Sequence, residues 1–166
     1  MQIPYHDKTT LEVVHRFLKD FQPDALILNG DIADFAALST YRLTLAQREG
    51  LREEGLLLRN ELHLLRDVLP HARIQYILGN HEARLAAYIT DHAPELGWLE
   101  DGPLSVEALA KTDELGIEVV GPYGASVDWN GLLVTHGTII RDNTAKANLI
   151  REGSSGISGH THRISS

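Results

Sequence analysis

Polar residues that can bind metal ions or transfer protons follow four short apolar runs of the chain, each beside a glycine. The four groups are Gly30-Asp31, Gly79-Asn80-His81, His136-Gly137 and Gly159-His160-Thr161-His162. Carboxylate, amide oxygen and imidazole form a ligand mixture that suits Mn, Fe, Zn, Ni or Co better than Ca. Residues two apart in an extended segment point the same way, so His160 and His162 are expected to converge on one cluster.

Each of these residues also has a plainer explanation when taken alone. Asp31 after a glycine is typical of a turn or helix cap, and Asn80 is typical of a left-handed turn. A lone His136 is more often a hydrogen-bonded or surface residue than a ligand. The plain explanation of the whole set needs a separate coincidence at each of four strand ends, so the metal-site interpretation is preferred.

The elements that must position these residues are short strands separated by helices. Continuous apolar runs predict strands at 25–28, 74–78, 132–135 and 157–158. The first has the pattern of a strand buried on both faces. Helical spacing predicts a helix over 10–20 and helices over 40–69, where Gly50 and Gly55 are expected to divide the stretch.

The remaining third of the chain adds a helical region and a hairpin. Residues 83–115 are expected to be mostly helical, as a cap or flank, and 117–120 and 125–129 to be strands. Asn130-Gly131 is typical of a tight hairpin turn. Strands that alternate with helices predict an α/β sheet covered on both faces, in which ligands bind at the carboxyl ends of the strands. Neither a repeat nor a linker divides residues 1–166, so we expect a single domain.

The composition excludes several classes of protein. The chain has 15 Lys and Arg against 23 Asp and Glu, for a net charge of −8. Proteins that coat nucleic acid or bind anionic membranes need a positive face, so we expect neither a membrane nor a nucleic-acid partner. Nucleic acid is considered only as a substrate. Without cysteine there is no disulfide or thiolate zinc site.

The sequence contains no targeting or membrane segment that we recognise. Its apolar runs are shorter than the roughly 18 residues of a membrane span, and Met1-Gln2-Ile3-Pro4 lacks the features of a signal peptide. We therefore expect a cytoplasmic protein.

The four polar groups resemble, in order, the sequence blocks of the calcineurin-like metallophosphoesterases. Gly30-Asp31-Ile32-Ala33-Asp34 resembles the G-D-x-x-D block, Gly79-Asn80-His81-Glu82 the G-N-H-E block, and Gly159-His160-Thr161-His162 the G-H-T-H block, with His136-Gly137 between them. The resemblance implies an α/β fold with a two-sheet β-sandwich flanked by helices. It also implies two divalent metal ions and hydrolysis of a phosphomonoester or phosphodiester by a metal-activated water.

The resemblance further implies a role for each matching residue. Asp31 would bridge the two metal ions, and His162 would bind one of them. The other ion would be held by Asn80, His136 and His160.

The catalytic roles implied by the family belong to the loop residues beside these ligands. His81 would lie over the scissile phosphate and protonate the leaving oxygen or stabilise charge on the phosphoryl group. Asp34 would orient His81. Glu82 is expected to hold the loop through hydrogen bonds made by its side chain.

One family block is absent from this sequence. Relatives begin with a strand ending in D-x-H, whose Asp and His bind the first metal ion, whereas this chain opens on residues resembling the stretch after that block. His6 and Asp7 are interpreted as loop residues at the pocket rim. Relatives also continue beyond the position of His162, so the chain is expected to be truncated at both ends.

The absent block changes the expected metal binding. One site retains only Asp31 and His162, and the other has four ligands, so we expect one tightly bound ion. A missing strand would also leave an association-prone sheet edge.

The leading hypothesis from the sequence is a metal-dependent phosphoesterase. The alternative is a catalytically weakened metal-binding domain that acts through protein contacts. Arg42 and Arg84 could approach a phosphate but are interpreted as solvated or salt-bridged residues. The stretch 42–69 is interpreted as an amphipathic layer over the sheet rather than a cap that shapes specificity.

Overall fold

The first of the two sheets is formed by strands that lie between residues 25 and 120. The computed structural model describes residues 1–42, 44–45, 50–99 and 102–162. Within them, β1 (Ala25–Asn29), β2 (Arg73–Ile77) and β3 (Ile117–Val120) form a parallel sheet in the order β1-β2-β3. All three strands therefore end at the same edge of the sheet, as their placement between helices predicts.

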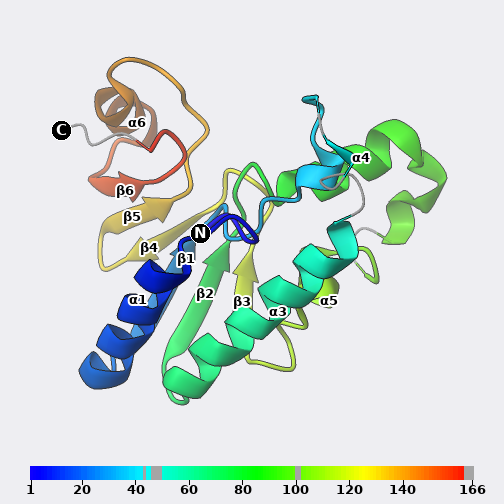
Figure 1. Cartoon of the computed structure of the whole chain (residues 1–166). Helices are drawn as coiled ribbons and strands as arrows, with labels where there is room; N and C mark the ends of the chain where they lie inside the picture. The colour runs from blue at the N-terminus through cyan, green and yellow to red at the C-terminus, as the bar shows by residue number, and fades with distance from the viewer. Residues whose placement is uncertain (43, 46–49, 100–101, 163–166) are drawn as a thin grey trace.

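The second sheet follows directly along the chain. Strands β4 (Ser126–Trp129) and β5 (Leu132–Thr135) pair antiparallel, and β6 (Gly156–Ser158) runs parallel to β5. Asn130 and Gly131 both have positive φ, 54° and 85°, which is the backbone of a type I′ turn and confirms the predicted hairpin. Figure 1 shows this sheet on the β1 side of the first one.

Helices surround the two sheets (Figure 1). They are α1 (Lys8–Phe21), α3 (Leu51–Val68), α4 (Ala83–His92), α5 (Val106–Ala110) and α6 (Thr144–Glu152), with 3-10 turns η1 (Ala36–Leu38) and η2 (Pro94–Leu99). The α/β arrangement of two small sheets with flanking helices agrees with the predicted fold class. None of the described helices is long and apolar enough to cross a membrane.

Helix α3 corrects the prediction that Gly55 interrupts the central stretch. The helix begins after Gly50 and runs through Gly55 without a break. One glycine costs a helix only about 1 kcal/mol. Burial of Leu58, Leu62 and Leu65 in the core outweighs that cost, because packing of the apolar face supplies most of a helix's stability. Residues 43 and 46–49, which lie in the same predicted stretch, are outside the described residues.

The hydrophobic core lies against the first sheet, and β2 is its centre. Residues 74–77 of β2 are all buried, between the leucines of α3 and the neighbouring strands. Strand β1 was predicted to be buried on both faces, and this is wrong, because only Leu28 is buried and the other four residues are half-exposed. The cause is its position, since among the described strands β1 pairs with β2 alone.

The carboxylate of Glu82 joins the loops that follow β1 and β2. The side chain is 1% exposed. It accepts hydrogen bonds of 2.6–3.0 Å from five donors, which are the backbone N–H groups of Asp31, Ile32, Ala33 and Gly79 and the hydroxyl of Tyr76. Two loops about fifty residues apart in sequence are thereby held against one another, as was expected of this residue.

Replacing Glu82 by Gln is expected to lower the free energy of unfolding by about 3 kcal/mol or more, because an amide NH₂ would face backbone N–H groups in a buried site. Urea denaturation followed by circular dichroism measures the loss. Glu12→Gln, an exposed change in α1, is the control. Equal stability of the two variants would contradict the role given to Glu82.

Candidate metal centre

Four strand ends bring the predicted metal ligands together. Asp31 follows β1, His136 follows β5 and His160 follows β6. One ligand atom from each of these three residues lies within 4.8 Å of those of the other two. Asp31 and His136 are buried, whereas His160 is half-buried.

Asn80, from the loop after β2, completes the group. Its Oδ1 lies 2.8 Å from Nδ1 of His160 and 3.1 Å from Nε2 of His136. With the amide turned over, its nitrogen would donate to the Asp31 carboxylate at 3.3 Å and to the same two histidine nitrogens. In the orientation found, a carbonyl oxygen, a carboxylate and two imidazoles point toward one another. This donor set fits a divalent cation.

Two glycines allow the backbone to approach this closely. A Cβ on Gly30, which has φ of 73°, would lie 2.3 Å from Nδ1 of His136. A Cβ on Gly79 would lie 2.3 Å from Oδ1 of Asp31. Any side chain at either position would displace a member of the cluster.

Hydrogen bonds orient the His136 ring, and contacts within the cluster shift the pKa values of its members. Nδ1 of His136 donates to the carbonyl of Asn29 at 2.8 Å, so Nε2 is the atom that faces Oδ2 of Asp31, at 3.3 Å. Burial opposes the charged forms of both residues, but their mutual contact outweighs it. The pKa of Asp31 is therefore lowered and the pKa of His136 raised. Burial, together with the neighbouring His136, lowers the pKa of His160.

His162 lies beside the cluster rather than within it. It lines a hollow of about 300 Å³ together with Asp31, His136 and His160, and the first two residues of the chain form part of the wall. The premise that His160 and His162 share an extended segment is wrong, since both have left-handed φ, 60° and 51°. The chain bends at each of them, and His162 is exposed.

A second group of polar side chains lies on another side of Asp31. Nδ1 of His81 contacts Oδ1 of Asp34 at 2.7 Å, and Nε2 of His81 lies 3.7 Å from Oδ2 of Asp31. The first contact fixes the ring and directs Nε2 away from Asp34. The structure thus brings His81 and Asp34 together beside the cluster.

Three residues near these groups were not assigned from the sequence. Arg84 donates from Nη1 to the Asp34 carbonyl at 2.7 Å, and its Nη2 lies 3.4 Å from Nε2 of His81. Its position three residues after His81, at the start of a helix, was the available signal. Tyr123 lies with its ring centre 6.3 and 6.4 Å from those of His136 and His160, and it follows the end of β3. Glu54 had no sequence signal.

His6 and Asp7, the two residues near the N-terminus that the sequence analysis considered, lie in different local environments. Asp7 caps α1 and accepts a hydrogen bond from the N–H of Thr10 at 2.8 Å, which lowers the pKa of Asp7. Nδ1 of His6 is buried without a hydrogen-bond partner. Among the described residues, neither belongs to a group of three potential metal ligands.

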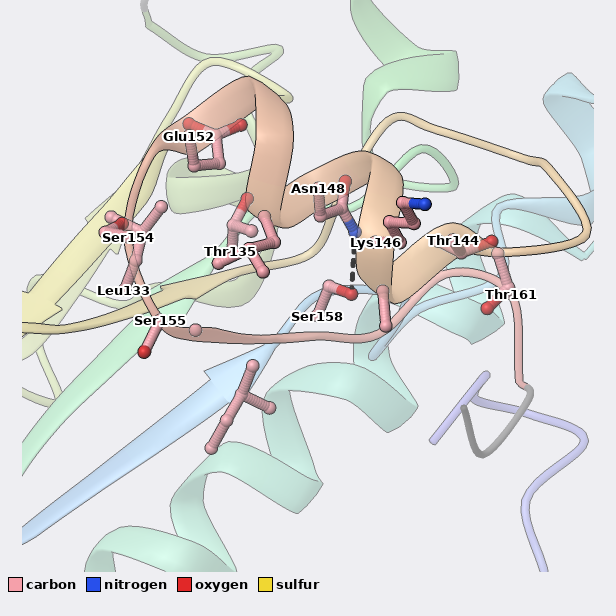
Figure 2. A pocket seen from close by; sticks show the side chains of 14 residues that line it. Leu133, Thr135, Thr144, Lys146, Asn148, Glu152, Ser154, Ser155, Ser158 and Thr161 are labelled. Atoms are coloured by element: carbon pink, nitrogen blue, oxygen red, sulfur yellow. Dashed lines mark hydrogen bonds between the residues drawn. The ribbon is translucent and has the colours of Figure 1, made fainter. Parts of the chain in front are cut away.

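A larger hollow of about 680 Å³ lies between α6 and strands β5 and β6 (Figure 2). Hydroxyl side chains dominate its polar lining, and Asn148 donates to the hydroxyl of Ser158 at 3.0 Å across it. Of the described residues, none of the cluster formed by Asp31, Asn80, His136 and His160 lines this hollow. It is therefore separate from the candidate metal centre.

Comparison with known proteins identifies the family. The model of the calcineurin-like phosphoesterases matches residues 4–163, so this chain belongs to that family. Metal-dependent hydrolysis of phosphate esters is the activity that defines the class. No solved structure matches the chain significantly.

Two curated relatives are phage proteins. The chain is 30% identical over 174 residues to the Gene 54 protein of Mycobacterium phage L5 and 32% identical over 174 residues to the Gene 54 protein of Mycobacterium phage D29. Each alignment covers 98% of this chain and 66% of the relative. The chain therefore spans just under two thirds of the length of each relative.

Glu54 makes the stability of the site depend on pH. This α3 residue is 3% exposed, and its carboxyl accepts a hydrogen bond from the N–H of Phe35, next to Asp34. Burial raises the pKa of Glu54 to about 7, although hydrogen bonds from the loop oppose the shift. Between pH 4.5 and 7 the folded chain keeps a proton that the unfolded chain releases, so this residue's contribution to stability falls as pH rises.

Glu54→Gln removes this titration. We expect the variant to gain roughly 2–3 kcal/mol relative to the parent chain between pH 5 and pH 8. Urea denaturation at each pH measures the difference, and the exposed neighbour Glu53→Gln is the control. Parallel pH profiles of parent and Glu54→Gln would contradict the shifted pKa.

Proposed function

We propose that this chain is a phosphoesterase in which Asp31, Asn80, His136 and His160 hold a divalent metal ion. The convergence of these side chains from four strand ends is the observation that carries the proposal. They supply one carboxylate, one amide oxygen and two imidazoles, a set that suits Mn, Fe, Zn, Ni or Co. The contact between Nδ1 of His136 and a carbonyl fixes the ligating nitrogen.

A second ion would share Asp31 and use His162. Both residues line the same hollow, which supports this assignment. Two protein ligands give such an ion little to offset repulsion from its neighbour. We therefore expect one tight site in this chain and a second, weak site.

The bound ions would supply Lewis acidity, which polarises phosphate oxygens and lowers the pKa of water. They would also reverse the negative potential of a protein with net charge −8, so that an anionic ester can approach. The remaining roles belong to the chain's own side chains. No group of the protein needs to act as the nucleophile.

His81 is proposed as the catalytic acid. Oδ1 of Asp34 lies 2.7 Å from Nδ1 of His81 and fixes the ring, so that Nε2 is the nitrogen placed to donate a proton to the leaving oxygen. Nε2 lies 3.7 Å from the Asp31 carboxylate, close enough that a phosphate beside the cluster would touch it. Asp34 acts through His81 and is a positioning residue.

The metal assignment predicts which variants lose the ion. Calorimetric titration of the chelator-treated chain with Mn²⁺ should show about one tight site. His136→Ala and His160→Ala should each weaken it at least tenfold, since each removes one of four ligands, and Asp31→Asn should weaken both sites. His71→Ala, an exposed change, is the control. Unchanged binding in all three site variants would contradict the assignment.

The role of His81 predicts loss of turnover without loss of metal. With Mn²⁺ and p-nitrophenyl phosphate or its bis ester as substrate, His81→Ala should lose about 10²- to 10⁴-fold in kcat and keep its metal content. His92→Ala, at the exposed end of α4, is the control. A variant that loses metal but keeps its specific activity would contradict the role. Tight Mn²⁺ binding by the parent chain without turnover of either ester would favour a metal-binding domain that acts through protein contacts.

A further inference from the structure

The guanidinium of Arg84 lies where a phosphate at the candidate centre would meet it. Arg84 is the second residue of α4, and its side chain turns back across His81. Its Nη2 lies 3.4 Å from Nε2 of His81, and that nitrogen lies 3.7 Å from Oδ2 of Asp31. One phosphate oxygen can therefore lie within hydrogen-bonding distance of both Nη2 and Nε2.

The contacts of Arg84 leave its charge available to a ligand. Nη1 donates to the backbone carbonyl of Asp34, a neutral acceptor, at 2.7 Å. The carboxylate of Asp34 is 3.8 Å from Nη1 and is engaged more closely by His81, at 2.7 Å. The Arg84 side chain is 21% exposed, so a ligand can reach it.

We propose that Arg84 binds the phosphoryl group and selects phosphomonoesters over phosphodiesters, an inference that rests on the proposed function. A guanidinium presents N–H donors as a fork that fits two phosphate oxygens. A diester has only two terminal oxygens and one charge. If the guanidinium of Arg84 binds both of these oxygens, no terminal oxygen is left for the cation at Asp31. A monoester has a third terminal oxygen and, near neutral pH, close to a second negative charge.

The test compares two ligands that differ in charge and in the number of terminal oxygens. Inorganic phosphate represents the phosphoryl group of a monoester, and dimethyl phosphate represents a diester. Binding of each to the chain with Mn²⁺ is measured by calorimetry, after Mn²⁺ binding itself has been measured on the same sample. Arg84→Gln removes the charge, Arg84→Lys keeps the charge without the fork, and Arg52→Gln, an exposed change in α3, is the control.

We expect the parent chain to bind phosphate at least tenfold more tightly than dimethyl phosphate. Arg84→Gln should lose at least tenfold for phosphate and less than threefold for dimethyl phosphate, with Arg84→Lys intermediate and Arg52→Gln unchanged. Unchanged phosphate binding in Arg84→Gln overturns the inference. Equal losses for both ligands also overturn it, because they indicate that Arg84 only supports the loop. Failure to bind Mn²⁺ overturns the proposed function itself.

Discussion

The buried carboxylate of Glu82 is the interaction on which the candidate centre depends. It accepts five hydrogen bonds, four from backbone N–H groups of the loops after β1 and β2. Loop backbone has no ladder partners of its own, and its buried donors must be satisfied. One carboxylate does this for both loops and so fixes the distance between Asp31 and Asn80. Because α4 begins directly after Glu82, the same interaction also places His81 and Arg84.

The site concentrates negative charge in a protein that is already acidic. Asp31, Asp34, Glu54 and Glu82 all have their carboxyl groups close to the two loops, and desolvation penalises each charge. At Glu82 five hydrogen bonds satisfy the carboxylate oxygens, whereas at Glu54 burial raises the pKa to about 7. The resulting negative potential favours a cation at the cluster of Asp31, Asn80, His136 and His160. Arg84 supplies a positive charge beside His81.

The two sheets contribute unequally to the fold. The core is built on the first sheet, where β2 is buried between its neighbours and the helices. In the second sheet, all three residues of β6 are exposed, although this strand leads directly to His160. The candidate ligands His136 and His160, which follow β5 and β6, are thus positioned by contacts at the strand ends, such as that between His136 and the Asn29 carbonyl, more than by a core beneath them.

Much of this arrangement was contained in the sequence, because it depends on local patterns. Apolar runs that end at glycine identified the strands, and Asn130-Gly131 identified the hairpin. The ordered blocks around Asp31, Asn80, His136 and His160 identified the family and suggested these four residues as candidate metal ligands. Burial and contacts made across the chain were decided only by tertiary structure. The half-exposure of β1 follows from its place at the sheet edge, and the positions of Arg84, Tyr123 and Glu54 follow from packing of distant segments. Sequence spacing cannot reveal these features, because each depends on which segment lies opposite.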